Sequence, residues 1–151
     1  GLLNGLRVAC EMLEAEGLDA VFARHRRIAD GVRAAVAAWG LELCARTPDV
    51  QSDTVSAIRV PAGADANALV ARAAQTYNVA FGTGLGEVAG KVFRIGHLGM
   101  LTDVQALAGI AAAEMVMADL GMGVTAGSGV AAAQARYRAS VAGGAMDLAA
   151  E

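Results

Sequence analysis

The sequence predicts an α+β fold, in which helices cover a small antiparallel or mixed sheet of three to four strands. Two long segments at the start carry apolar residues at helical spacing, whereas the middle of the chain contains short apolar segments bounded by Gly or Pro. The composition favours helices, because 56% of the residues are hydrophobic and many of these are alanines, with only three Phe, two Tyr and one Trp. A chain of 151 residues is long enough for one domain with its own core.

Two helices are expected at the start of the chain. The first covers residues 2–16 and ends at Gly17, a residue type that often terminates helices. Its apolar period begins at once, without a cap, so we expect that a longer protein precedes it; an expression scar before a frayed end is the alternative. The second helix covers residues 18–39. Its apolar face consists of Leu18, Val21, Phe22, Ile28, Ala29, Val32, Ala35, Val36 and Trp39.

The middle of the chain predicts two strands and a helix. The strands are expected over residues 41–45 and 54–61, with a loop at Pro48 between them. The helix is expected over residues 62–78, where Asp65 has the character of an N-cap. The side chains expected to face inward from this helix are Leu69, Val70, Ala73 and Ala74.

Two more strands and a helix follow. The strands are expected over residues 79–82 and 91–99. The helix begins at Thr102, which forms a capping-box pattern with Gln105, and it closes at Gly121.

The remainder is a tail rich in Gly and Ala. We therefore divide the chain into a small domain, residues 1–121, and a tail, residues 122–151, whose pattern allows a short helix over residues 128–141.

Charge and cysteine content exclude several classes of partner. A net charge of −3 and a pI of about 5.3 argue against nucleic acid or an anionic membrane, which bind basic surfaces. The longest apolar window, residues 107–117, is too short to span a bilayer. Cys10 and Cys44 show no metal-ligand or redox spacing, and His25 and His97 are far apart, so no metal site is predicted. Free cysteines of this kind favour a cytoplasmic protein.

A glycine-rich loop precedes the last predicted strand. Its sequence, GTGLGEVAG, fails the dinucleotide-binding pattern because Glu87 stands where glycine is required, and it leads into a strand instead of a helix. The loop is either a plain connection between strands or a stretch of bare backbone beside a ligand. Because four glycines exceed the needs of a turn, we favour the second interpretation, with Gly82, Gly84 and Gly86 as residues of a binding cleft.

Arg94 is the candidate binding residue. It lies inside an apolar strand on the same face as Gly96, which leaves space beside it. A guanidinium group stays charged and must be paired or hydrated. Its partner is either a structural acid such as Glu87 or Asp103, or a carboxylate ligand bound through two hydrogen bonds. The apolar and glycine neighbours favour the ligand.

No catalytic residue is predicted. The sequence contains no serine nucleophile motif, and Lys91, the only lysine, is more simply a solvated residue at the edge of a strand than a Schiff-base nucleophile. His97 is either a proton carrier or a hydrogen-bonding group, and the absence of a nucleophile or acid at useful spacing favours the second.

Three segments resemble a known family. GKVFRIGHLG (residues 90–99), with the segments over residues 16–43 and 55–70, is similar to the C-terminal small domain of class V pyridoxal-phosphate aminotransferases of the serine–glyoxylate and alanine–glyoxylate type. The resemblance covers about residues 2–121.

The resemblance implies an aspartate-aminotransferase-like fold and a homodimeric, pyridoxal 5′-phosphate-dependent enzyme. It would transfer an amino group from a small amino acid (serine, alanine or aspartate) to glyoxylate or a similar oxo acid. The cofactor would be held mainly by a large N-terminal domain that is absent here, together with its covalently bound lysine, so we expect this chain to be inactive alone. Arg94 matches the family's substrate-carboxylate arginine, and residues 82–90 match its loop near the cleft. The alternative is a non-catalytic α+β module that binds a small carboxylate or mediates dimerisation.

Overall fold

The structure, a computed structural model, describes the backbone of residues 1–148 and the side chains of residues 1–140. This described part contains five α-helices and a three-stranded sheet, which confirms the α+β prediction. The elements are α1 (Leu2–Glu16), α2 (Leu18–Ala38), β1 (Val55–Arg59), α3 (Ala66–Tyr77), β2 (Gly82–Thr83), β3 (Val92–Gly96), α4 (Asp103–Asp119) and α5 (Ser128–Leu148), with single 3₁₀ turns η1 (Pro48–Val50) and η2 (Gly86–Val88).

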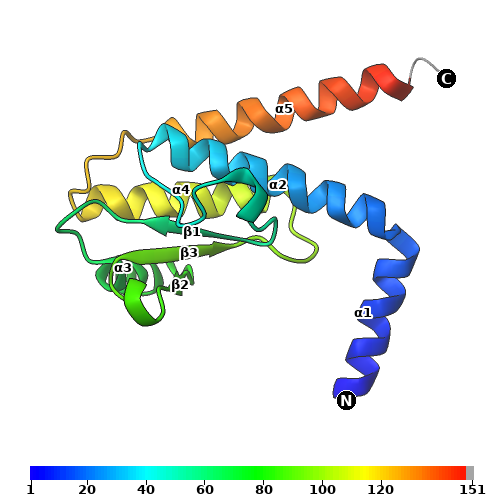
Figure 1. The fold of residues 1–151 in the computed structure, drawn as a ribbon, viewed down its shortest axis with the longest axis horizontal. Coiled ribbons are helices and arrows are strands. Elements are labelled where there is room, and N and C mark those ends of the chain that lie inside the picture. Colours follow the sequence, from blue (N-terminus) through cyan, green and yellow to red (C-terminus); the bar gives the residue numbers. More distant parts are fainter. Residues whose placement is uncertain (149–151) are drawn as a thin grey trace.

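The sheet is antiparallel and has β3 at its centre, in the order β1-β3-β2 (Figure 1). Ala57 of β1 and Gly82 of β2 lie on either side of Arg94 in this register. Because side chains alternate along a strand, neighbouring Phe93 and Ile95 point to the opposite face, where both are buried.

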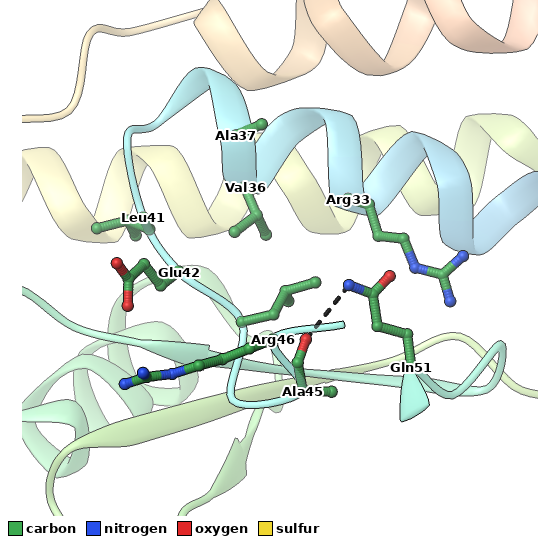
Figure 2. Close-up of a pocket in the computed structure, with 9 residues that line it drawn as sticks. Arg33, Val36, Ala37, Leu41, Glu42, Ala45, Arg46 and Gln51 are labelled. Atoms are coloured by element: carbon green, nitrogen blue, oxygen red, sulfur yellow. Dashed lines mark hydrogen bonds between the residues drawn. The ribbon is translucent and has the colours of Figure 1, made fainter. Parts of the chain in front are cut away.

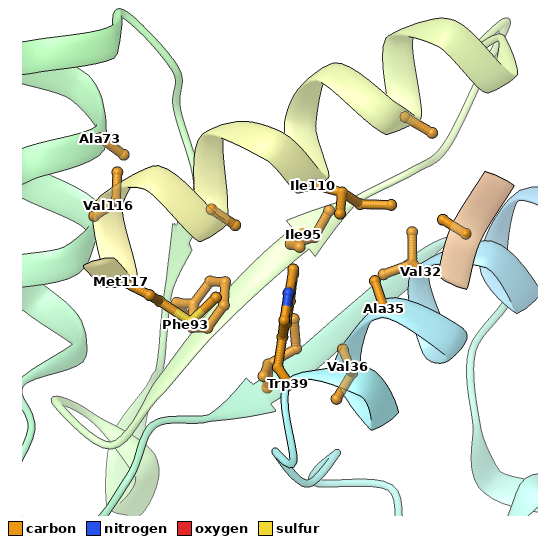
Figure 3. Close-up of a cluster of buried hydrophobic side chains, with 14 of the residues drawn as sticks. Val32, Ala35, Val36, Trp39, Ala73, Phe93, Ile95, Ile110, Val116 and Met117 are labelled. Carbon is orange, nitrogen blue, oxygen red and sulfur yellow. The ribbon is translucent and has the colours of Figure 1, made fainter. Parts of the chain in front are cut away.

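The core lies between that buried sheet face and helices α2, α3 and α4. Figure 3 shows side chains of α2, β3 and α4 directed toward one another. These include Val32, Ala35, Val36, Trp39, Phe93, Ile95, Ile110 and Met117, all of which are buried. The 3.6-residue period of α2 accounts for its share of the core, because it places these side chains on one face.

Helix α5 lies alongside α2 and joins the same core (Figure 1). Two glycines allow the close approach. A Cβ atom at Gly31 would lie 2.2 Å from the ring of Tyr137, and one at Gly129 would lie 2.4 Å from Trp39 Nε1. The Tyr137 hydroxyl donates to the carbonyl of Ile28, 3.1 Å away, across the same contact.

The helix boundaries agree closely with the sequence predictions, since their end signals are local. Gly17 separates α1 from α2, and the Asp65 side chain accepts from the backbone N–H of Asn67. Thr102 and Gln105 form the predicted capping box of α4. Helix α5 begins at the expected residue but continues to Leu148, beyond the predicted residue 141. The division of the chain at residue 121 stays a prediction.

The predicted strand over residues 41–45 is wrong. Only Leu43 pairs, as an isolated bridge to Ile58. The chain then turns away through η1, whose Pro48 has no N–H to donate to a ladder.

The strand predicted over residues 79–82 lies later and is shorter, as β2. The end of α3 accounts for the shift: Asn78 adopts a left-handed conformation with φ 53°, and Val79 N donates back to Ala73 O. Those residues therefore close the helix and cannot join the ladder. The strand predicted over residues 91–99 is likewise shorter, as β3.

Three residues expected to face inward are exposed. Ala74 faces solvent on α3, and Leu18 and Phe22 are 57% and 63% exposed at the start of α2. Leu18 and Phe22 are exposed because α1 projects away from the rest of the molecule (Figure 1), so the first turns of α2 have little to pack against. Helix α1 has no buried residue at all.

Among the described residues, none of the helices has the length and apolar character needed to cross a membrane.

Candidate functional site

Arg94 occupies the middle of the central strand and is partly buried. Its Nε atom donates a hydrogen bond to the carbonyl of Thr83, 3.0 Å away on β2. Among side chains of residues 1–140, no carboxylate lies within ion-pair distance of the guanidinium group. The structural partner Asp103, which the sequence left open, is instead paired through both oxygens with Arg27.

Gly82 provides the space that Arg94 occupies. The two residues are directly opposite in the β2–β3 ladder, and a Cβ atom at Gly82 would lie 3.1 Å from Arg94 Nε and 3.2 Å from Arg94 Cβ. Such contacts are tighter than most Cβ contacts in proteins, so a side chain at this position would require the Arg94 side chain to shift by a few tenths of an ångström.

The other loop glycines serve the tight return of the chain. A Cβ atom at Gly84 would lie 2.2 Å from the carbonyl oxygen of Val88, and Gly84 N donates to Val92 O at 2.8 Å. Gly86 has a positive φ of 57°, which favours glycine. The loop thus folds back against β3 through η2 and brings bare backbone next to the arginine strand.

His97 follows β3 and is fully buried. Its Nδ1 lies 3.0 Å from the carbonyl of Asp53, and its Nε2 lies 3.0 Å from the hydroxyl of Ser56. A carbonyl only accepts, so Nδ1 carries the proton, and Nε2 accepts from Ser56. Burial lowers the pKa of His97, which agrees with a neutral ring. The hydrogen-bonding interpretation of this histidine is therefore the one observed.

His25 holds the next part of the same segment. Its Nδ1 donates to Val21 O at 2.7 Å, and its Nε2 accepts from Gly99 N at 3.1 Å. Arg24 donates to the carbonyl of Gly99. The chain that leaves β3 is therefore attached to α2 at Gly99.

A cavity of about 430 Å³ lies between the end of α2 and residues 41–51 (Figure 2). Arg33, Glu42, Arg46 and Gln51 contribute its polar groups. The guanidinium groups of Arg33 and Arg46 point to opposite ends of the pocket in Figure 2, and Arg33 is already paired with Asp30. These charges do not converge, so the pocket is not a candidate site.

Lys91 lies at the exposed start of β3, where its Nζ donates to Glu87 O at 3.3 Å. Within the described side chains, no group of three His, Cys, Asp or Glu residues is arranged to hold a metal ion.

The fold of the chain is similar to part of a solved aminotransferase. It superimposes on pyridoxamine–pyruvate aminotransferase from Mesorhizobium loti with a TM-score of 0.85 and 39% identity, over 91% of this chain and 35% of that one. No protein-family model matches the chain.

Relatives found by sequence similarity are named as aminotransferases that use glyoxylate. The chain is 68% identical over 142 residues to L-aspartate–glyoxylate aminotransferase of Paracoccus denitrificans, and 59% identical over 132 residues to serine–glyoxylate aminotransferase of Hyphomicrobium methylovorum. These matches cover 94% and 87% of this chain but only 36% and 33% of the relatives, so the chain spans about a third of their length. These similarities confirm the resemblance of the chain to the C-terminal part of class V aminotransferases.

Sequence reasoning missed the groups that hold Arg94 and His97 in place. Thr83 acts through its backbone carbonyl, which any residue would supply, so no sequence signal marks it. The Asp53 carbonyl is likewise a backbone group that no sequence signal marks. Ser56 lies 41 residues before the histidine that it contacts, so their spacing in the sequence does not indicate the contact.

Proposed function

We propose that this chain is the C-terminal part of an aminotransferase that moves an amino group from serine, alanine or aspartate to glyoxylate or a similar oxo acid. In this proposal Arg94 binds the α-carboxylate of both substrates. One observation carries the assignment: a partly buried guanidinium group lies over a glycine, with no carboxylate partner among the described side chains.

The geometry suits a carboxylate clamp. The bond from Nε to Thr83 fixes one edge of the guanidinium group and leaves the two terminal nitrogens for a ligand. Two parallel N–H···O bonds to a carboxylate orient it as well as bind it, and a charge-assisted hydrogen bond contributes about 1.5–3 kcal/mol. Fixing the carboxylate orients the neighbouring Cα bonds, on which transamination depends.

The cofactor of the proposed enzyme is pyridoxal 5′-phosphate, which supplies the electron sink for the reaction. Lys91, the only lysine of the chain, lies at an exposed strand end, which supports a cofactor-binding lysine outside this segment. We therefore assign cofactor binding mainly to a large N-terminal domain of a longer protein. Gly82, Gly84 and Gly86 would border the cleft between that domain and this one.

The apolar surface of α1 supports the missing domain as a partner. Leu2, Leu3 and Leu6 are 95%, 82% and 62% exposed, although α1 is amphipathic. A helix face of this kind is normally covered. The proposal also includes a homodimer in the cytoplasm, with residues 1–121 as the small domain and residues 122–151 as a tail.

Substitution of Arg94 in the full-length enzyme tests the proposal. Arg94→Gln is expected to lower kcat/KM for the amino acid and the oxo acid about a hundredfold or more, because substrate alignment is lost. Arg46→Gln is the matched control, since Arg46 is an exposed arginine outside the strand.

A kcat/KM near the wild-type value in Arg94→Gln would remove Arg94 from the site. A parent reading frame without an upstream cofactor-binding lysine would favour the non-catalytic carboxylate-binding module instead.

A further inference from the structure

The segment that leaves β3 is held by three hydrogen bonds from one residue. His97 donates its backbone N–H to Thr54 O at 2.9 Å, while its ring bonds to Asp53 O and to the Ser56 hydroxyl. All three partners lie at the entry to β1. His97 therefore joins the end of the central strand to the start of its neighbour.

The position of this junction relates it to Arg94. Ser56 is followed by Ala57, which lies directly opposite Arg94 in the ladder, and His97 follows Arg94 by three residues. Between the arginine and the histidine lie Ile95, whose side chain is buried in the core on the opposite face of the sheet, and Gly96, which is exposed and has no side chain. The first side chain after the arginine that forms hydrogen bonds to the neighbouring strand and its entry loop is therefore the His97 ring.

The acceptor of the His97 proton is itself fixed. The Asp53 carboxylate is paired with Arg26 at 2.9 Å and with Arg33 at 2.7 Å. Arg33 also binds Asp30 on α2 at 3.0 Å. The ion pairs of the Asp53 side chain therefore hold the residue whose carbonyl accepts the hydrogen bond from His97.

The segment beyond the histidine has little else to order it. Leu98 and Met100 are 72% and 67% exposed, and Gly99 is held by His25 and Arg24. Without the His97 ring, the exit of β3 would be held by its backbone hydrogen bonds, by Ile95 in the core and by the bonds at Gly99, with no side-chain hydrogen bond to the start of β1.

We propose that His97 is a positioning residue for Arg94: its buried ring locks the end of β3 to Asp53 and Ser56, so that the guanidinium group is held ready for the substrate carboxylate. This inference rests on the proposed function of Arg94. It assigns His97 no proton transfer and no contact with substrate.

The test uses three variants in the full-length enzyme. His97→Leu removes both ring bonds and is expected to raise KM for the amino acid and the oxo acid about tenfold, with a smaller effect on kcat. His97→Asn retains a donor at the position of Nδ1 and is expected to keep KM within threefold of the wild type. Ser56→Ala removes the Nε2 partner and is expected to raise KM about threefold.

A matched control separates positioning from general destabilisation. Trp39→Phe removes a buried hydrogen bond to Glu114, 2.9 Å long, in another part of the core, and is expected to leave KM unchanged. Amide hydrogen exchange at residues 96–100 is expected to accelerate in His97→Leu and not in Trp39→Phe.

The double variant Arg94→Gln/His97→Leu shows whether the histidine acts through the arginine. Its KM should equal that of Arg94→Gln alone, since no guanidinium group remains to be positioned. Multiplicative effects, or a KM within twofold of the wild type in His97→Leu, would overturn the inference. If His97→Leu does not fold, an unchanged KM in Ser56→Ala overturns it.

The two proposals fail in different ways. An Arg94→Gln variant with wild-type KM refutes the carboxylate role, and the inference with it. If KM rises in Arg94→Gln but keeps its wild-type value in His97→Leu, only the positioning role of His97 is refuted.

Discussion

Gly82 and Arg94 face each other across the β2–β3 ladder, and a Cβ atom at Gly82 would lie 3.1 Å from Arg94 Nε. The side chain of the arginine lies over the glycine and reaches the carbonyl of Thr83. Glycine at this position therefore avoids a close contact with the arginine side chain, and no positive φ angle is involved.

This contact predicts a graded effect of side-chain size at Gly82. In the full-length enzyme, Gly82→Ala is expected to raise KM for the oxo acid about threefold and Gly82→Val about tenfold, because the guanidinium group is displaced. Steady-state kinetics measure both. Gly109→Ala is the control: a Cβ atom there meets nothing within 4 Å, so this change should leave KM unaltered. Equal KM values across the series would refute the packing role.

Glu114 is buried and anchors the start of α5. Its carboxylate accepts from Trp39 Nε1 at 2.9 Å, Gly127 N at 3.0 Å and Gly129 N at 2.5 Å. Glu114→Gln turns an NH₂ group toward N–H donors and is expected to lower the free energy of unfolding by about 2–3 kcal/mol. Urea denaturation checks this value, with exposed Glu11→Gln expected to change it by less than about 0.5 kcal/mol.

The contact between α2 and α5 predicts coupling between Gly31 and Tyr137. Gly31→Ala improves helix propensity by up to about 1 kcal/mol, but its Cβ atom would overlap the tyrosine ring, so a net loss of about 1–3 kcal/mol is expected. In a Tyr137→Leu background the same change should cost less, and a thermal-unfolding double-mutant cycle would detect it. Additive effects would contradict the contact.

His97 predicts a pH dependence of stability. Burial is the main cause that lowers the pKa of its ring, while the Asp53 carbonyl and carboxylate raise it and Arg33 and His25 lower it. As the pH falls, the His97 ring is therefore protonated at a higher pH in the unfolded chain than in the folded chain. The contribution of the neutral ring to stability is complete above about pH 6.5, and the free energy of unfolding falls as the pH decreases below that value. The slope contributed by this group is at most about 1.4 kcal/mol per pH unit. Unfolding measured from pH 7.5 to 5.5 should show a shallower dependence in His97→Asn.

The exposed apolar face of α1 predicts self-association of the isolated chain. Leu3 and Leu6 are 82% and 62% exposed on one helix, so the chain should form oligomers or aggregates in light scattering. Leu3→Glu/Leu6→Glu is expected to reduce this association. Val50→Glu is the control, because Val50 is also 62% exposed but lies in a separate turn. A monomeric wild-type chain would contradict the prediction.

Local signals accounted for most of the helices and for the choice of Arg94. Gly17, the Asp65 cap and the Thr102–Gln105 capping box act over a few residues, so their positions could be read without knowledge of the fold. Arg94 could be identified from its apolar strand and from the family motif around it, although its role stays a proposal.

What the sequence by itself determined, then, is where most of the helices begin and end, that the chain is α+β, and which motif carries the family likeness. Only the tertiary structure decided that residues 41–45 make a single bridge, that β2 is displaced by the end of α3, and that Gly31 must admit a tyrosine from far along the chain. It alone showed that Gly82 makes room for Arg94 and that His97 bonds to Asp53 and Ser56. The physical reason is that helix ends depend on hydrogen bonds within one turn, whereas strand pairing and close packing depend on partners that only the folded chain brings together.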